Sequence, residues 1–503
     1  MANLLFDHLV APLATRNSTF LMDSGGREIE GCSLYETAMS LASALTALGL
    51  KAGDRMAVQV DKTPEALALY CAAVAAGVVF LPLNTAYTAA EVDYFVSDAE
   101  ASLLVADPAK AELLTEVARR NGARFETLDG KGEGSLREHA RKQVGGFEPV
   151  ARSGEDLAAI LYTSGTTGQS KGAMLSHDNL LSNARVLAEE WRFQASDVLL
   201  HALPIFHTHG LFVATNVVML SGGSMIFLPG FKTDEVIKWL PRATTMMGVP
   251  TFYTRLLDTP AFTGELVKHM RLFTSGSAPL LAETHQRFEE RTGHRILERY
   301  GMTETNMNTS NPYDGDRRAG TVGRALPGVE VKITNPETGK DVPQGEPGVI
   351  EVRGPNVFRG YWRMPDKTRE ELRMDGFFIT GDIGTLDTDG YVTIIGRQKD
   401  LIITGGYNVY PKEIELILDE QPGVLESAVV GVPHPDFGEA VIAVLVARPG
   451  QTVDAAVVAA AMGERLARFK QPKHIAIVAD LPRNTMGKVQ KNLLREQFTS
   501  LFA

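Results

Sequence analysis

Hydrophobic positions follow two alternating periods through the first half of the chain. Between Ser33 and about Leu228, stretches with helical periodicity are separated by short runs rich in β-branched, aliphatic and aromatic residues. We expect strands at residues 55–60, 78–81, 101–105, 158–162 and 224–228. Strands that alternate with helices are typical of parallel sheets, so this part is predicted to have an α/β fold.

The pattern of expected strands, helices and turns changes twice in the rest of the chain. A second α/β passage follows, with strands expected at residues 245–249 and 272–275. From Gly320, Gly/Pro turns and short strands predict a small β unit, with strands at residues 329–333, 348–353 and 391–395. The final segment predicts a compact α+β module. Its helices are expected at 411–420, 453–467 and after Lys488, and its strands at 424–432, 440–447 and 474–478.

Composition narrows the class of protein. A chain of 503 residues is too long for one core, and 44% apolar with 22% charged residues is ordinary for a globular protein. The net charge of −11 argues against nucleic acid as a partner. Cys32 and Cys71 support neither a disulfide framework nor a zinc site. Because the apolar runs are interrupted and the start lacks a signal peptide pattern, we expect a cytoplasmic protein with no membrane partner.

The most informative segment is the loop Thr-Ser-Gly-Thr-Thr-Gly-Gln-Ser-Lys-Gly at 163–172, directly behind a predicted strand. Glycines let backbone N–H groups approach a phosphate, hydroxyls donate hydrogen bonds, and a lysine adds positive charge. A Walker A loop would need glycine at 170 and Ser or Thr at 172, but the chain has Ser170 and Gly172. The loop therefore predicts a polyphosphate site of another kind.

Five further segments are too dense in Gly, Thr and charge to be ordinary connections. They are Thr-Ser-Gly-Ser-Ala-Pro-Leu (274–280), Arg-Tyr-Gly-Met-Thr-Glu-Thr (299–305), Phe-Ile-Thr-Gly-Asp-Ile-Gly (378–384), Gly-Arg-Gln-Lys-Asp-Leu-Ile (396–402) and Pro-Arg-Asn-Thr-Met-Gly-Lys (482–488). In this order, and with the 163–172 loop, the chain resembles the acyl-adenylate-forming enzymes. This superfamily includes acyl-CoA synthetases, luciferases and peptide-synthetase adenylation domains, and the resemblance runs from about Ser33 to Arg495.

The resemblance implies a two-step reaction and a set of ATP-binding residues. A carboxylate attacks the α-phosphorus of ATP and releases pyrophosphate, and a thiol then displaces AMP to form a thioester. Oriented donors and cations must bring the two anions together. The ATP-binding residues implied are Thr163, Ser164, Gly165, Thr166, Thr167, Gly168, Lys171, Gly276, Ser277, Ala278, Tyr300, Gly301, Met302, Asp382 and Arg397.

Individual roles are also implied by the resemblance. Tyr300 is expected to stack on adenine, and Asp382, supported by Arg397, is expected to accept the ribose hydroxyls. The catalytic residues implied are Thr303 at the α-phosphate, Glu304 as the Mg²⁺ ligand, and Lys488 between the substrate carboxylate and the α-phosphate. Because the charge of Lys488 would be essential, a lysine acyltransferase is an expected regulatory partner.

Family members rotate a C-terminal module between the two half-reactions. The resemblance implies an N-terminal ATP- and acyl-binding domain at 1–396, a mobile domain at 397–503 and a hinge at Lys399. Gly405, Gly406 and Tyr407 are then expected to line the CoA tunnel. Because the chain ends soon after its last predicted helix, a free thiol, CoA, is expected as the acceptor rather than a fused carrier domain.

Polar residues gather where the family builds its acyl pocket. They are His207, His209, Arg255 and Ser277. A buried guanidinium suits a second carboxylate, which it can meet with two parallel hydrogen bonds. With these residues the chain resembles the malonyl-CoA synthetases, which implies malonate as the acid, 2-methylmalonate as a tolerated analogue, and ATP, Mg²⁺ and CoA as co-substrates and cofactor.

Three alternatives remain open from the sequence. The acid could instead be a neutral short-chain or aryl carboxylic acid. The protein could be a stand-alone adenylation enzyme that loads a separate carrier protein, or a non-catalytic nucleotide-binding module. Release of AMP in the presence of free CoA would exclude the last two.

Overall fold

The computed structural model describes residues 2–143, 145–163, 170–336, 338–404, 407–484 and 487–502. The chain divides into two compact units. Unit 1 contains Met1–Glu330 and Val352–Phe378, and unit 2 contains Val331–Glu351 and Ile379–Ala503. The small β unit thus groups largely with the C-terminal residues, while the expected domain boundary at 396/397 stays a prediction.

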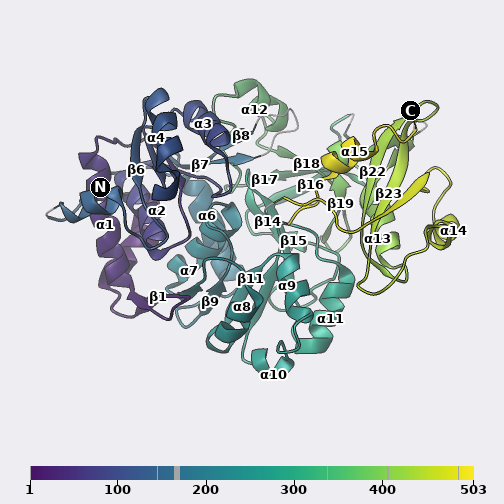
Figure 1. Ribbon diagram of the computed structural model, residues 1–503, viewed down its shortest axis with the longest axis horizontal. Helices are drawn as coiled ribbons and strands as arrows, with labels where there is room; N and C mark the ends of the chain where they lie inside the picture. The colour runs from purple at the N-terminus through teal and green to yellow at the C-terminus, as the bar shows by residue number, and fades with distance from the viewer. Residues whose placement is uncertain are drawn as a thin grey trace. The chain divides into compact units, whose positions relative to one another are not determined.

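Unit 1 holds a six-stranded sheet with the order β6-β5-β3-β4-β7-β8 (Figure 1). Its strands are β3 (Arg55–Gln59), β4 (Val79–Pro82), β5 (Leu103–Ala106), β6 (Arg124–Thr127), β7 (Leu157–Thr163) and β8 (Lys171–Ser176). All neighbours are parallel except β7 and β8. The predicted strands at 55–60, 78–81, 101–105 and 158–162 coincide with β3, β4, β5 and β7 to within two residues at either end.

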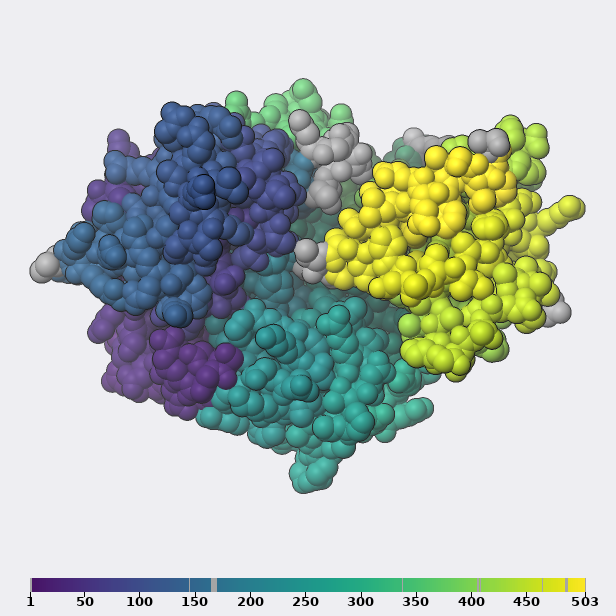
Figure 2. Space-filling view, viewed as in Figure 1, coloured from purple at the N-terminus to yellow at the C-terminus, as the bar shows by residue number. Residues whose placement is uncertain are grey.

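A nine-stranded sheet in the same unit has the order β15-β14-β13-β12-β11-β9-β10-β1-β2. Its strands are β1 (Thr19–Asp23), β2 (Glu28–Glu30), β9 (Val198–His201), β10 (Ser224–Phe227), β11 (Thr245–Gly248), β12 (Leu272–Ser275), β13 (Leu297–Met302), β14 (Asn306–Ser310) and β15 (Arg324–Ala325). β10 was expected in the first α/β passage, but it pairs here with β1 and β9. The purple N-terminal segment accordingly lies beside teal residues in Figure 2.

Helices cover these sheets. They are α1 (Gly31–Ala47), α2 (Pro64–Ala76), α3 (Ala89–Asp98), α4 (Ala111–Arg120), α5 (Ser135–Arg141), α6 (His177–Glu190), α7 (Asn216–Ser221), α8 (Thr233–Trp239), α9 (Pro250–Leu257), α10 (Gly264–Val267), α11 (Ala282–Thr292) and α12 (Pro365–Glu371). One core cluster joins strand residues Leu81, Leu104 and Ile160 to Phe95 of α3 and Leu114 of α4. Within the described residues, no helix is long and apolar enough to cross a membrane.

Unit 2 contains most of a four-stranded sheet and a five-stranded sheet. The first runs β16 (Glu330–Thr334), β17 (Gly348–Arg353), β18 (Phe378–Leu386) and β19 (Val392–Arg397). The second joins β20 (Ile402–Thr404), β21 (Tyr407–Val409), β22 (Val424–His434), β23 (Gly438–Ala447) and β24 (His474–Val478). It is buried on both faces, by α13 (Pro411–Asp419) and α14 (Ala455–Arg465) on one and by α15 (Lys491–Phe498) on the other. These elements confirm the predicted α+β module.

Candidate active site

The predicted site residues of unit 1 follow the carboxyl ends of parallel strands. Thr163 ends β7, Gly276 and Ser277 follow β12, and Thr303 and Glu304 form the turn after β13. The crevice outside the carboxyl ends of parallel strands is where α/β proteins bind ligands. The sheet topology thus brings segments distant in sequence to ligand-binding edges.

Glu304 lies at the centre of a small polar network. The Thr163 hydroxyl donates to its Oε1 over 3.3 Å, and the Tyr361 hydroxyl lies 3.1 Å from the same oxygen. Tyr361 also donates to Oε2 of Glu371 over 2.6 Å. One hydroxyl proton cannot serve both carboxylates at once. Glu304 is 5% exposed, and a cation beside its buried carboxylate would be favourable.

The network fits the expected magnesium. Mg²⁺ usually binds one or two protein carboxylates together with waters and substrate phosphates, rather than a cage of protein ligands. Glu304 supplies such a carboxylate, and the Thr163 hydroxyl adds an oxygen beside it. These residues would hold the ion, and the ion would neutralise charge on the phosphates of ATP.

Lys171 lies at the start of β8 and is almost buried. Its Nζ is 3.0 and 3.1 Å from the two carboxylate oxygens of Glu371 and 4.1 Å from the centre of the Tyr361 ring. The phosphate-loop residues Ser164, Gly165, Thr166, Thr167 and Gly168 lie outside the described residues. Their predicted roles stay predictions.

The expected adenine-binding residues lie in two adjacent strand ends. Gly276 is buried, Ser277 and Ala278 are half-buried, and Tyr300 is 7% exposed, while Gly301 and Met302 close β13. Ser277 has a φ of 68°, in the left-handed region that non-glycine residues rarely adopt. Such strain persists where the surroundings fix the backbone, and it is frequent at functional sites.

Ser277 contacts one of the two predicted pocket histidines. Its Oγ lies 3.2 Å from Nδ1 of His209. His209 is 2% exposed, and its Nε2 has no hydrogen-bond partner among the residues that the structure describes. Burial, with Arg299 adding to the effect, holds the pKa of His209 well below its ordinary value, so the imidazole is neutral at pH 7. His207 is half-buried two residues earlier.

Arg299 was not among the predicted site residues, and its environment is unusual. The side chain is 2% exposed, and all three guanidinium nitrogens lack a hydrogen-bond partner in the described part of the chain. Its Nη1 would lie 2.3 Å from a Cβ placed on Gly276. Burial lowers the pKa of Arg299 to about 10, against the influence of Tyr253 and Glu298, so the group stays charged at pH 7. We call Arg299, His209, Ser277 and Gly276 the Arg299 cluster.

The expected burial of Arg255 is not observed, while its predicted contact with the substrate stays a prediction. Arg255 is exposed in the last turn of α9. The buried face of this helix consists of Phe252, Tyr253, Leu256 and Leu257, which leaves Arg255 on the other side. Arg299 of β13 instead offers a buried cation; in the sequence it stands between Glu298 and Tyr300, which gives no sign of its burial.

Unit 2 brings together the predicted ribose-binding pair. Asp382 of β18 and Arg397 of β19 are register partners, and the Arg397 Nε lies 2.7 Å from Oδ1 of Asp382. Asp382 is 4% exposed, and its backbone N–H is held by the Thr380 hydroxyl at 3.0 Å. This pairing holds the Asp382 carboxylate in one position. The predicted role, in which the carboxylate accepts two ribose hydroxyls, needs such a fixed position.

The remaining predicted residues also lie in unit 2. Lys399 is exposed in a single 3₁₀ turn (Gln398–Asp400) between β19 and β20. Tyr407 is 57% exposed and stacks on Phe469 with ring centres 4.6 Å apart. Lys488 is exposed, and its backbone N–H donates to Oδ1 of Asn484 over 3.0 Å. Gly405 and Gly406 fall outside the described residues.

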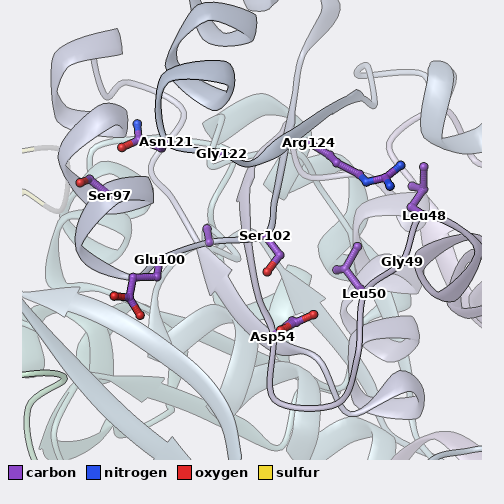
Figure 3. A pocket seen from close by; sticks show the side chains of 11 residues that line it. Leu48, Gly49, Leu50, Asp54, Ser97, Glu100, Ser102, Asn121, Gly122 and Arg124 are labelled. Atoms are coloured by element: carbon purple, nitrogen blue, oxygen red, sulfur yellow. The ribbon is translucent and has the colours of Figure 1, made fainter.

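None of these residues lines the cavity of about 430 Å³ that Figure 3 shows. Its lining includes Asp54, Ser102 and Arg124, which stand at the amino ends of β3, β5 and β6. Parallel sheets bind ligands at the opposite edge. We therefore assign this cavity no part in the chemistry.

Comparisons with known proteins identify the family. The AMP-binding enzyme family matches residues 12–362, and the AMP-binding enzyme C-terminal domain matches residues 413–488. The chain is 36% identical over 480 residues to malonate–CoA ligase of Arabidopsis thaliana, covering 88% of this chain and 78% of that protein. It is 34% identical over 500 residues to sulfoacetate–CoA ligase of Cupriavidus necator, covering 97% of each. The crystal structure of ATP-bound MatB from Rhodopseudomonas palustris is 57% identical, with a TM-score of 0.97, and covers 100% of this chain and 99% of that one. The chain therefore belongs to the AMP-binding enzyme family, as its motifs predicted.

Proposed function

We propose that this protein ligates malonate to coenzyme A and that it tolerates 2-methylmalonate as an alternative acid. ATP is cleaved to AMP and pyrophosphate, and malonyl-adenylate is the intermediate. The similarity to the malonate–CoA ligase of Arabidopsis thaliana supports this acid. The similar sulfoacetate–CoA ligase is named for another short acid with two anionic groups.

The Arg299 cluster carries the proposal. The described residues give the buried, charged guanidinium of Arg299 no hydrogen-bond partner, which is costly, and a bound carboxylate would satisfy it. The second carboxylate of malonate is held close to the reacting one, because a single methylene separates them. Arg299 would meet it with two parallel hydrogen bonds, and the Ser277 hydroxyl and neutral His209 would add further hydrogen bonds. A neutral acid would leave Arg299 unsatisfied.

The other residues of unit 1 would serve ATP. Lys171 and the 163–168 segment hold the β- and γ-phosphates, Thr303 contacts the α-phosphate, and Tyr300 stacks on adenine between Gly276, Ala278, Gly301 and Met302. Thr163 and Glu304 hold Mg²⁺. These groups bring a carboxylate and a polyphosphate together and stabilise the charge that develops at the α-phosphorus.

Unit 2 would contribute residues to both half-reactions. Asp382 and Arg397 bind ribose, and Lys488 neutralises charge between the carboxylate and the α-phosphate during adenylation. A turn of residues 397–503 at Lys399 then replaces Lys488 by Tyr407, Gly405 and Gly406, which line the path of CoA. Because Lys488 is exposed, a lysine acyltransferase could reach it and switch adenylation off. The proposal includes a cytoplasmic location, where ATP and CoA are available.

A screen of acids tests this function. Pyrophosphate and AMP release would be measured with acetate, butyrate, benzoate, malonate, methylmalonate and succinate, each with and without CoA. Malonate should give the highest kcat/KM, and succinate should be poor because its extra methylene displaces one carboxylate. Preference for butyrate or benzoate would favour the neutral-acid ligase, and adenylation without CoA-dependent AMP release would favour a carrier-loading enzyme.

A further inference from the structure

The ion pair between Lys171 and Glu371 ties the phosphate-binding lysine to a helix outside the sheet. Glu371 is the last residue of α12, and Figure 1 shows α12 beside β7 and β8. The chain that leads to this helix runs along β8: Tyr361 forms a bridge with Ala173, and the backbone N–H of Trp362 donates to the carbonyl of Gly172 over 2.7 Å. Backbone pairing therefore fixes α12 next to Lys171.

Both carboxylate oxygens of Glu371 contact the Nζ of Lys171, at 3.0 and 3.1 Å. The lysine side chain is 9% exposed and that of Glu371 is 22% exposed, so water screens the pair only in part. A lysine ammonium has three donors, and this contact occupies the side that faces Glu371. A polyphosphate that takes Lys171 must compete with an anion already in place.

Glu371 has other partners, which remain when its contact with Lys171 opens. The Tyr361 hydroxyl donates to it over 2.6 Å, and Lys367 lies 3.0 Å away on the same helix. These bonds, with that of Lys171, outweigh burial and hold the pKa of Glu371 below its ordinary value. The carboxylate thus stays charged in both situations, which lets the contact open without leaving a buried charge unpaired.

We propose that Glu371 is a positioning residue that exchanges with pyrophosphate for Lys171. Before ATP binds, Glu371 holds Lys171 at the start of β8 and neutralises it. ATP displaces this contact, and after adenylation Glu371 takes Lys171 back, which speeds pyrophosphate release and disfavours the reverse reaction. No covalent bond is involved. The inference rests on the proposed function only in taking Lys171 as a ligand of the polyphosphate.

The chain supplies a matched control. Glu370 is the neighbouring carboxylate on α12, is 64% exposed, and pairs with Lys367 at 2.8 Å. Glu370→Gln removes the same charge from the same helix without touching the Lys171 contact. Glu371→Asp keeps the charge but shortens the side chain, so it separates direct contact from a long-range effect of charge.

The test is calorimetric binding of magnesium pyrophosphate to the full-length protein, with no acid present. Glu371→Gln should bind about 10-fold more tightly than the parent, Glu371→Asp should also bind more tightly, and Glu370→Gln should bind as the parent does. Unchanged or weaker binding by Glu371→Gln would overturn the exchange. If Glu371→Gln bound tightly while Glu371→Asp bound as the parent does, the effect would come from the charge alone. That result would also overturn the proposed exchange.

A second readout separates this idea from a structural role and from the choice of acid. In steady-state turnover, Glu371→Gln should lower the inhibition constant of pyrophosphate by the same factor and lower the KM for ATP. A merely structural role would raise both. If malonate proved not to be the substrate, the binding measurement would still decide the role of Glu371, because it contains no acid.

Discussion

Replacing Arg299 by methionine tests whether this guanidinium selects a dicarboxylate. Methionine keeps much of the length of the side chain but removes the charge and all donors. Arg299 has no hydrogen-bond partner among the described residues, so the change should not lower the melting temperature. It should strongly affect malonate, whose second carboxylate would enter the site without a partner.

The size of the loss follows from the burial of the site. Leaving one member of a buried ion pair unpaired costs about 3–5 kcal/mol, and each 1.4 kcal/mol is about a factor of ten in kcat/KM. Arg299→Met should therefore lower kcat/KM for malonate by a factor between about one hundred and a few thousand. Butyrate, which carries no second charge, should be unaffected or improved.

The assay is the ratio of malonate to butyrate turnover in the parent and two variants. Arg255→Met is the matched control, because Arg255 is exposed on α9, and it should leave the ratio within about twofold. An unchanged ratio in Arg299→Met would refute the role of Arg299. A collapse of the ratio in Arg255→Met instead would restore the sequence-based prediction and show that the exposed arginine reaches the substrate.

Three further changes test other parts of the account. Lys488→Ala should slow adenylation by about 10²–10⁴, as expected for a lost electrostatic contact, but should spare the conversion of supplied acyl-adenylate by CoA; equal losses in both half-reactions would contradict the assignment. Lys399→Pro fixes φ at the proposed hinge, so adenylation should survive while thioester formation slows, and an unchanged CoA step would exclude the hinge. Burial raises the pKa of Asp419 from 3.8 to about 6. Between pH 4 and 6 the folded protein therefore keeps a proton on Asp419 that the unfolded protein has lost. The free energy of unfolding falls as the pH rises through this range. Asp419→Asn removes this cost while keeping an acceptor for Ser427, and should stabilise unit 2 by about 2–3 kcal/mol at pH 7 but little at pH 4; a melting difference that does not grow with pH would count against it.

Local patterns predicted many of the strands, because apolar runs and turn residues are local signals. Residues 272–275 and 474–478, for example, coincide with β12 and β24. The pairing of β1 with β10 could not be predicted in this way, since it joins residues about 200 positions apart and depends on the whole sheet. That pairing places β10 in the nine-stranded sheet instead of the sheet expected from sequence order.

Site residues that lie in dense sequence motifs were predicted. A site residue whose role depends on its burial was missed. The segment 299–305 pointed to Tyr300, Thr303 and Glu304, yet its first residue, Arg299, reads as an ordinary charged residue of a strand. Its importance lies in the absence of a described partner, which no sequence shows. The burial expected of Arg255 was wrong for the converse reason, because helical periodicity turns this residue to the exposed side of α9, and its contact with the substrate stays a prediction.

Turnover of malonate labelled with ¹⁸O in its carboxylates tests the central claim most directly. In an adenylate mechanism the attacking carboxylate oxygen stays on the phosphate when CoA displaces AMP. With ATP, Mg²⁺ and CoA, the account predicts malonyl-CoA and AMP that carries one ¹⁸O atom per turnover. Unlabelled AMP, formation of ADP, or absence of malonyl-CoA while another acid forms its thioester would contradict it.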